Sequence, residues 1–427
     1  MSVERLKILF IVPGSGDAFY CGNCFRDSLH AHALRRAGHD VTVMPLYLPL
    51  KDISFSGDTP LFFPAVSLFV AQKYFVKKKM PGWMEKLLNS DFALNMAASF
   101  SGTTSSAGLE DMTLSMITGE GGVFRRQAAP LIKYVKEQEQ PDVIHISSSL
   151  IIGVAKAIRQ EMPHIPVVCS LQDEEIWIDC LNKADADAAW KGIADNSRYV
   201  DRFVASSRFY RQAVEKRLPS LKDIGVVYPG VEIEKYASDE YPDRPVIGFF
   251  YRMNEADGAD ILAEAFVKLK RENRVAGLRL RIGGGYTSQD KPFLKRVSRI
   301  LKPYAADVER FDTYSLRQHA DFYRGISAIS VPLRFEEGTG LYLCEAFAAG
   351  RPAVEPDTGS FREITGDAGI LYSPNSPDML AEAIAELFTA KGRWDECRKN
   401  ALKLAESRYN ETVQAEALYA IYAGVES

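Results

Sequence analysis

Two glutamates eight residues apart, Glu337 and Glu345, enclose a short glycine-containing segment, residues 338–341. Carboxylates accept hydrogen bonds from vicinal hydroxyls such as those of a sugar or a ribose. The segment follows an apolar run typical of a buried strand and precedes a helical pattern that stops at Gly350. Free amides at a helix N-terminus favour an anion such as a diphosphate. The spacing therefore indicates a site for phosphate and hydroxyl groups, although an ordinary βα unit with surface glutamates has the same outline.

A second charged group follows the apolar run 245–251, which predicts another strand. Arg252 comes directly after this run, and a guanidinium suits a diphosphate. Asp257 lies five residues further on, where a carboxylate would repel a diphosphate. We therefore expect Asp257 to turn away, to pair with a cation, or to mark lost or altered donor use.

Polar candidates in the first half of the chain also lie at strand ends. Residues 141–145 form a strand pattern that ends on His145, and residues 165–171 form another that is followed by Gln172. In an open α/β sheet these ends face the binding crevice. His145 could meet a substrate or be a satisfied core histidine. Gln172 can bond a sugar hydroxyl but cannot act as an acid or a base.

The elements that position these residues alternate between strands and helices, which predicts parallel sheets. The first unit runs from a strand at 7–12 through a helix to a strand at 40–44. Its loop glycines do not form G-x-G-x-x-G, because Phe19 stands at the third glycine position. No acid ends the second strand, so the fingerprint of dinucleotide oxidoreductases is absent.

Cys21 and Cys24 form a C-x-x-C at the start of the first helix, where a lowered thiol pKa would favour redox chemistry. A zinc site would need two more ligands, and His30 and His32 point to different helix faces. The alternative is a tight loop lined by small side chains.

Composition limits the class of protein. The chain has 427 residues, of which 46% are hydrophobic and 25% charged, which suits two globular domains. A net charge of −4 gives no basic field for nucleic acid. The apolar run 8–12 is too short for a signal peptide, and no run approaches the ~20 apolar residues that span a bilayer. Six cysteines suggest no disulfide framework, so a cytoplasmic location is expected.

Residues 61–88 mix aromatic and basic side chains. Such a segment could make peripheral contact with a membrane. It could also form the wall of an acceptor pocket, or simply belong to the core of helices on the first domain.

The segment from Glu337 to Glu345, followed by Ala349-Gly-Arg-Pro-Ala353, resembles the Glu-x7-Glu motif of retaining glycosyltransferases of the GT-B fold, in particular family 4. The resemblance covers nearly the whole chain except about 46–130. It departs from the family at three places: Thr339 replaces an aromatic residue, Asp257 replaces a lysine, and Gln172 replaces a histidine.

The resemblance implies an α/β GT-B fold in which two Rossmann-like domains face each other across a cleft. Residues 1–235 would form the acceptor domain, joined by a returning C-terminal helix at about 410–427. Residues 236–409 would form the domain that binds the nucleotide sugar.

The implied function is transfer of a hexose, with retention, from a UDP- or GDP-type sugar to a polysaccharide, lipid-linked or small-molecule acceptor. No metal and no cofactor beyond the donor substrate is expected. The residues expected to be catalytic are Glu337, His145 and Arg252. Those expected to bind the donor are Gly22, Gly338, Thr339, Gly340, Leu341, Glu345 and Gln172. Two alternatives stay open: a non-catalytic protein that binds nucleotide sugars, and a sugar-nucleotide epimerase.

Overall fold

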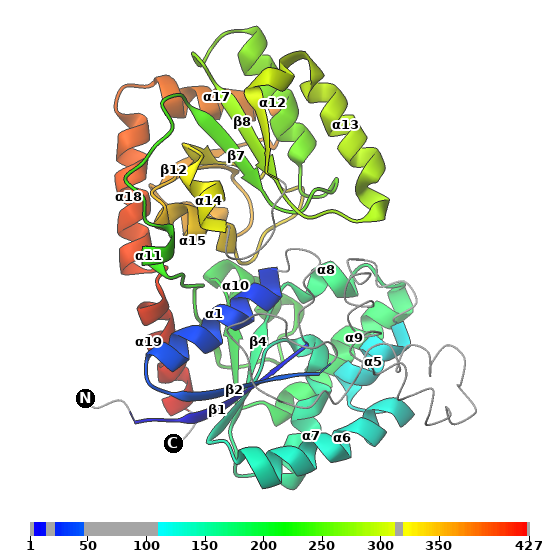
Figure 1. The fold of residues 1–427 in the computed structure, drawn as a ribbon. Coiled ribbons are helices and arrows are strands. Elements are labelled where there is room, and N and C mark those ends of the chain that lie inside the picture. The colour runs from blue at the N-terminus through cyan, green and yellow to red at the C-terminus, as the bar shows by residue number, and fades with distance from the viewer. Residues whose placement is uncertain (1–3, 14–21, 47–109, 312–318, 425–427) are drawn as a thin grey trace, which may run out of the picture. The chain divides into compact units, whose positions relative to one another are not determined.

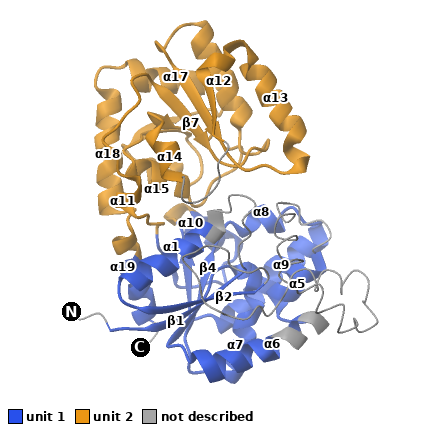
Figure 2. Cartoon of the chain, viewed as in Figure 1, with its two compact units in different colours: residues 1–206, 210–227, 415–427 blue, residues 207–209, 228–414 orange. Residues whose placement is uncertain are grey.

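The computed structural model describes residues 4–13, 22–46, 110–311 and 319–424. The chain divides into two compact units (Figure 2). Unit 1 comprises residues 1–206, 210–227 and 415–427, and unit 2 comprises residues 207–209 and 228–414. The units therefore separate at 227/228 and 414/415, within ten residues of the domain limits expected from the sequence. The segments 61–88 and 14–21, which include Cys21 of the C-x-x-C, lie outside the described residues.

Unit 1 is built on a six-stranded sheet in which every pairing is parallel (Figure 1). The strand order is β2-β1-β3-β4-β5-β6, so the chain reverses its direction of progress across the sheet between β1 and β3. The strands are β1 (Lys7–Val12), β2 (Asp40–Pro45), β3 (Val143–Ile146), β4 (Val167–Leu171), β5 (Arg202–Ala205) and β6 (Ile224–Val226).

Both faces of this sheet are covered, as the continuous apolar strands predict. In β1, Ile8 and Phe10 face a core that includes residues of α1 and of the C-terminal helix α19, while Leu9 and Ile11 face the core on the opposite side. Ala415, Leu418 and Tyr422 carry α19 onto unit 1, which confirms the expected return of the last helix. The helices are α1 (Gly22–Arg36), α5 (Glu110–Thr118), α6 (Gly122–Tyr134), α7 (Gly153–Glu161), α8 (Glu174–Ile178), α9 (Lys183–Asn196), α10 (Arg208–Arg217) and α19 (Glu411–Ala423).

Unit 2 contains a second parallel sheet of six strands in the order β12-β11-β10-β7-β8-β9. Its strands are β7 (Val246–Phe250), β8 (Arg279–Gly283), β9 (Val308–Phe311), β10 (Ala328–Ile329), β11 (Ala353–Pro356) and β12 (Gly369–Tyr372). Its helices are α11 (Ile233–Tyr236), α12 (Ala259–Arg271), α13 (Lys291–Leu301), α14 (His319–Arg324), α15 (Leu341–Ala348), α16 (Phe361–Thr365), α17 (Pro377–Thr389) and α18 (Arg393–Ser407).

The order of the second sheet reverses between β7 and β10, which are neighbours although the chain passes through β8 and β9 between them. Ligands of open α/β sheets bind outside the carboxyl ends of the strands at such a switch point. The loop after β7 carries Arg252 and Asp257, and the loop after β10 carries Glu337. The topology therefore brings to one sheet edge the charged residues that the sequence separates by about 80 positions.

Among the described residues, the structure has no helix long and apolar enough to cross a membrane.

Candidate functional site

The loop between β10 and α15 is shaped by glycine. Gly340 is the residue before α15 and has φ of +62°, a left-handed conformation that side chains rarely adopt. A Cβ at this position would lie 2.7 Å from Cδ1 of Ile364. Gly359 has a φ of +57°, and a Cβ there would meet the backbone N of Glu337 at 2.7 Å. These glycines allow the chain to turn sharply enough to place Glu337 at the start of α15.

The Glu337 carboxylate is held at the N-terminus of α15 and is only 5% exposed. Its Oε1 accepts hydrogen bonds from the backbone N–H groups of Thr339 (2.9 Å) and Gly340 (2.8 Å). Its Oε2 accepts a 3.2 Å hydrogen bond from the hydroxyl of Tyr251, which follows β7. These three hydrogen bonds fix the orientation of the Glu337 carboxyl group. Two of the amides expected to bind phosphate therefore hold Glu337 in this structure.

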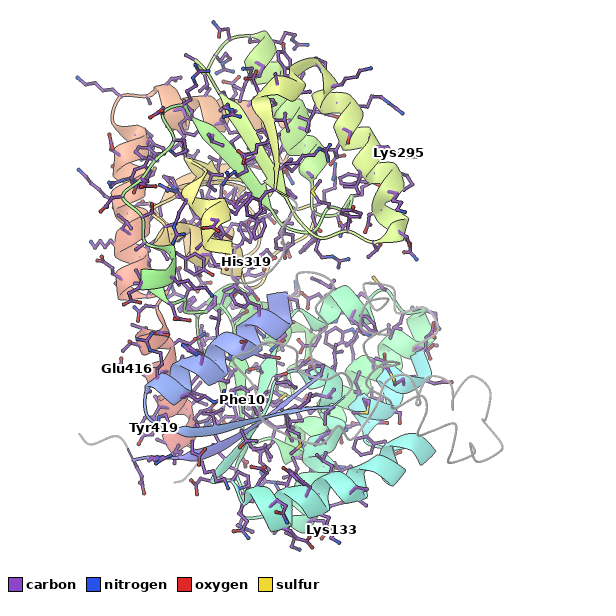
Figure 3. The ribbon with its side chains drawn as sticks, viewed as in Figure 1. Phe10, Lys133, Lys295, His319, Glu416 and Tyr419 are labelled. Carbon is purple, nitrogen blue, oxygen red and sulfur yellow. The ribbon has the colours of Figure 1, made fainter. Side chains whose placement is uncertain are left out.

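Glu345 lies in the middle of α15 and has no exposed surface. Its carboxylate accepts hydrogen bonds from the hydroxyls of Tyr236 (2.6 Å) and Tyr323 (2.8 Å), and Nδ1 of His319 lies 3.0 Å from Oε1. Figure 3 labels His319, which opens α14. The carboxylate thus meets hydroxyl groups, as its chemistry predicts, but they belong to the protein. A ribose could reach Glu345 only by displacing one of these side chains, so that contact stays a prediction.

Arg252 and Asp257 occupy the loop that joins β7 to α12. Asp257 is 3% exposed and directly precedes Gly258, the residue immediately before α12. Burial raises the pKa of Asp257 to about 8, Arg252 opposes this shift, and the carboxylates of Glu337 and Asp290 add to it. The acid is therefore mostly protonated at pH 7. The repulsion expected from a carboxylate does not apply to this neutral acid, because the local environment as well as the residue type sets the charge of a buried acid.

Glycines also bring the loops of unit 2 close to one another. A Cβ on Gly258 (φ +76°) would lie 2.0 Å from the carbonyl oxygen of Pro332 in the loop after β10. A Cβ on Gly284 (φ +151°), after β8, would lie 1.6 Å from the carbonyl oxygen of Tyr251. Larger residues at either position would push apart the loops that carry Arg252, Asp257 and Glu337.

The candidates of unit 1 have a different environment. His145 has no exposed surface, its Nδ1 lies 2.7 Å from the hydroxyl of Tyr422, and its Nε2 lies 2.8 Å from the hydroxyl of Ser170. Its ring stacks on Phe10 with centroids 4.4 Å apart. Burial, with a smaller contribution from Arg26, lowers the pKa of His145 to about 3. Both ring nitrogens are therefore engaged, and His145 ties α19 to the sheet, whereas its expected catalytic role stays a prediction.

Gln172 follows β4 and is 3% exposed. Its Nε2 donates a 2.6 Å hydrogen bond to Oδ1 of Asp27, a buried acid of α1. Burial raises the pKa of Asp27 to about 7, against the opposing effects of Arg26, Gln172 and Ser147. Gly22 is the first residue of α1. Donor contacts of Gln172 and Gly22 remain predictions.

Sequence reasoning missed the residues that hold the two glutamates. It did not connect His319, Tyr323, Tyr236 or Tyr251 with either glutamate. Their partners come from 22 to 109 positions away, so no local pattern links them. The available signal was the buried glutamate itself, because a carboxylate inside a helix of apolar residues requires hydrogen-bond donors.

Two protein-family models match the chain, one in each part. Residues 244–390 match the model described as "Glycosyl transferases group 1" and residues 115–235 match the model described as "Glycosyltransferase Family 4". The first lies entirely within unit 2.

Curated relatives share part of their length with this chain. A probable sucrose-phosphate synthase from Craterostigma plantagineum is 29% identical over 186 residues, which is 40% of this chain and 17% of that protein. A lipopolysaccharide core biosynthesis mannosyltransferase, LpsB of Rhizobium meliloti, is 26% identical over 190 residues, 42% of this chain and 52% of that protein. The match thus spans about half of LpsB and about a sixth of the synthase.

Solved structures resemble the chain over its full length. A sucrose-phosphate synthase from Thermosynechococcus elongatus aligns with 98% of this chain and 99% of its own, at a TM-score of 0.68 and 15% identity. Anabaena HepE in complex with UDP and glucose covers 98% and 100%, at a TM-score of 0.64 and 14% identity. At these identities the likeness establishes the fold. With the motif at Glu337–Glu345, the two family models and the two parallel sheets, the chain belongs to the family-4-like glycosyltransferases of the GT-B fold.

Proposed function

We propose that this protein transfers a hexose from a nucleotide-diphosphate sugar to a polysaccharide, lipid-linked or small-molecule acceptor, with retention of anomeric configuration and without a metal ion. The observation that carries the proposal is the switch point of unit 2. There Arg252 and the N-terminus of α15 lie at the same sheet edge as a carboxylate that the protein itself holds in place. A cation and oriented dipoles suit a diphosphate, and Glu337 suits a sugar hydroxyl.

In this proposal the leaving diphosphate is stabilised as its charge develops. Arg252 and the amides of Gly338 and Leu341 supply positive potential without reorganising during the reaction, which is how oriented donors lower a barrier, while the amides of Thr339 and Gly340 hold Glu337. Glu337 contacts the transferred sugar and is held in position by the amides of Thr339 and Gly340. HepE has been solved with UDP-glucose, which favours a uridine-type donor over other nucleotides as the first to test.

A donor screen tests the proposal directly. The purified protein is incubated with UDP- and GDP-sugars and candidate acceptors, release of UDP or GDP is measured, and NMR gives the anomeric configuration of the product. EDTA in a parallel reaction tests the metal-independent mechanism. Binding of neither nucleotide, or turnover unchanged in Glu337→Gln, would overturn the assignment.

A second candidate is a protein that binds nucleotide sugars without transferring them. Asp257 and Gln172 favour it, because they replace a cation and a titratable group expected from the family. Calorimetry that detects nucleotide-sugar binding, together with no product from any acceptor, would support this candidate. Conversion of the donor to another sugar nucleotide in the absence of an acceptor would instead indicate an epimerase.

A further inference from the structure

Asp257 has a buried carboxyl group whose Oδ2 has no hydrogen-bond partner among the described residues. The loop around it is held in place. The backbone N–H of Asp257 donates a 3.1 Å hydrogen bond to Oδ1 of Asn254, and the next residue, Gly258, lies against the carbonyl of Pro332. Directly after Gly258 begins α12, a helix of 13 residues. An unsatisfied polar atom in a fixed, buried position beside a helix N-terminus is a group that a polar ligand atom would satisfy.

The charged groups around Asp257 come from several elements. Arg252 on its own loop favours the anion, whereas Glu337 before α15 and Asp290 before α13 disfavour it. Two further cations, Arg334 and Arg296, reach this loop, and both bind other carboxylates: Arg334 contacts Asp260 at 2.9 Å, and Arg296 contacts Asp260 at 3.0 Å and Glu255 at 2.8 Å.

Asp290 is itself held in a fixed position. Its Oδ2 accepts hydrogen bonds from the backbone N–H (2.7 Å) and the hydroxyl (2.8 Å) of Thr287. The negative charges that act on Asp257 therefore have fixed positions, and they disfavour the charged form of the Asp257 carboxyl group.

We propose, on the basis of the function proposed above, that Asp257 binds the donor as a neutral acid. Its protonated Oδ2 donates a hydrogen bond to an oxygen of the diphosphate. A protonated carboxyl group offers one O–H donor, whereas the carboxylate can only accept. One hydrogen bond from a neutral acid thus replaces the charge contact that a lysine would make. No covalent bond is made or broken, and the hydrogen bond requires that the proton is present on Asp257 and that the donor reaches its buried Oδ2.

This arrangement makes nucleotide binding depend on pH. The pKa of Asp257 is about 8 before binding, and the nearby negative phosphates raise it further in the complex. Above pH 8 the free protein loses the proton that the complex needs. Binding must then take up a proton, and affinity falls roughly tenfold for each pH unit.

Calorimetric titration of the full chain with UDP and with GDP, from pH 6.5 to 9.5, tests the inference. Repeating the titration in buffers of different ionisation enthalpy gives the number of protons taken up. The wild type is expected to lose roughly tenfold in affinity between pH 8.5 and 9.5 and to take up a proton there. Asp257→Asn keeps a hydrogen-bond donor that does not titrate, so its affinity is expected to stay constant over this range with no proton uptake.

Asp290→Asn serves as a second variant because it removes a charge that raises the pKa of Asp257 without touching that side chain. Its loss of affinity is expected to begin at lower pH than in the wild type, and thermal unfolding verifies that the variant is folded. If Asp257 had a purely structural role, the pH at which affinity begins to fall would be the same in Asp290→Asn and in the wild type. Binding by the wild type that is flat with pH, or Asp257→Asn that follows the wild-type profile, overturns this inference alone. If neither nucleotide binds at any pH, the proposed function fails and the inference fails with it.

Discussion

The two sheets of this protein are built alike, but the polar residues near the carboxyl ends of their strands are used differently. At β3 and β4 of unit 1, the polar groups satisfy one another: His145 bonds Ser170 and Tyr422, and Gln172 bonds Asp27. At β7 and β10 of unit 2, Arg252, Asp257 and Glu337 lie on loops beyond the strands. A polar residue at a strand end is therefore a poor guide to chemistry where the protein itself satisfies its hydrogen bonds, as at His145, whereas Oδ2 of Asp257 has no partner among the described residues.

The same contrast exists within one motif. Glu337 precedes α15 and is held by backbone amides, whereas Glu345 lies inside α15 and is held by Tyr236, Tyr323 and His319. One carboxylate is positioned at the helix end, and the other is an acceptor that fastens three elements together. Substitutions at Glu337, Glu345, His145 and Arg252 test these two contrasts.

The largest effect is expected from Glu337→Gln. The amide oxygen can still accept from the backbone N–H groups of Thr339 and Gly340, so the loop should fold, but the negative charge near the sugar is lost. We expect kcat to fall by roughly 10²–10³, the range for the loss of one preorganised electrostatic group. Initial rates with the best donor measure it. Glu336→Gln, at the exposed neighbouring position, is the matched control and should keep wild-type rates. Equal rates in both variants would remove Glu337 from the site.

Glu345→Ala should act on stability. It leaves the hydroxyls of Tyr236 and Tyr323 buried without their acceptor, which we expect to cost roughly 2–4 kcal/mol. Urea unfolding followed by circular dichroism measures the change. Tyr323→Phe removes one donor and should cost less, about 1 kcal/mol. If Glu345→Ala is as stable as the wild type but has lost nucleotide binding, the result would support the predicted contact between Glu345 and the ribose.

His145→Gln should also act on stability, by roughly 1–2 kcal/mol, because one of two buried hydrogen bonds is lost. We expect kcat to be unchanged in the folded variant, whereas a catalytic histidine would cost at least 10²-fold. Such a loss would overturn the assignment of His145 to the core.

The pH dependence of stability gives a second test of His145. Its pKa of about 3 in the folded protein lies below the unfolded value of about 6.5. The unfolded chain therefore binds the proton preferentially, and the stability contributed by this residue is present above pH 6.5 and declines as pH falls toward 3. The pH 4–7 slope of unfolding free energy should be smaller in His145→Gln than in the wild type.

Arg252→Gln is expected to have the smallest effect, about tenfold in the affinity for UDP or GDP, which corresponds to the ~1.4 kcal/mol of one charge-assisted contact. The affinity of the wild type should fall as the salt concentration rises, whereas the affinity of the variant should be nearly independent of salt. Isothermal titration at two ionic strengths measures this. Arg271→Gln, near the end of α12, is the control. Unchanged affinity in Arg252→Gln would mean that the switch point of unit 2 does not hold the diphosphate.

Much of the architecture was predictable from local patterns. The continuous apolar runs at 7–12 and 245–251 predicted buried parallel strands, and the glycine before Leu341 predicted the start of α15. The loop that carries Glu337 follows from the same pattern, because glycine conformations and helix ends depend on neighbouring residues. Partners distant in sequence were not predictable. Tyr236 meets Glu345 and Tyr422 meets His145 only because the fold brings them together.

The sequence alone determined the strand–loop–helix units, the family motif from Glu337 to Glu345, and the residue types available for chemistry. Tertiary structure decided which of those residues are committed to the protein and which charge they carry. His145 is neutral and enclosed, Glu345 is an internal anchor, and burial among like charges raises the pKa of Asp257 to about 8. The physical reason is that hydrogen-bond partners and the local dielectric are properties of the surroundings, and the surroundings come from segments that are far apart along the chain.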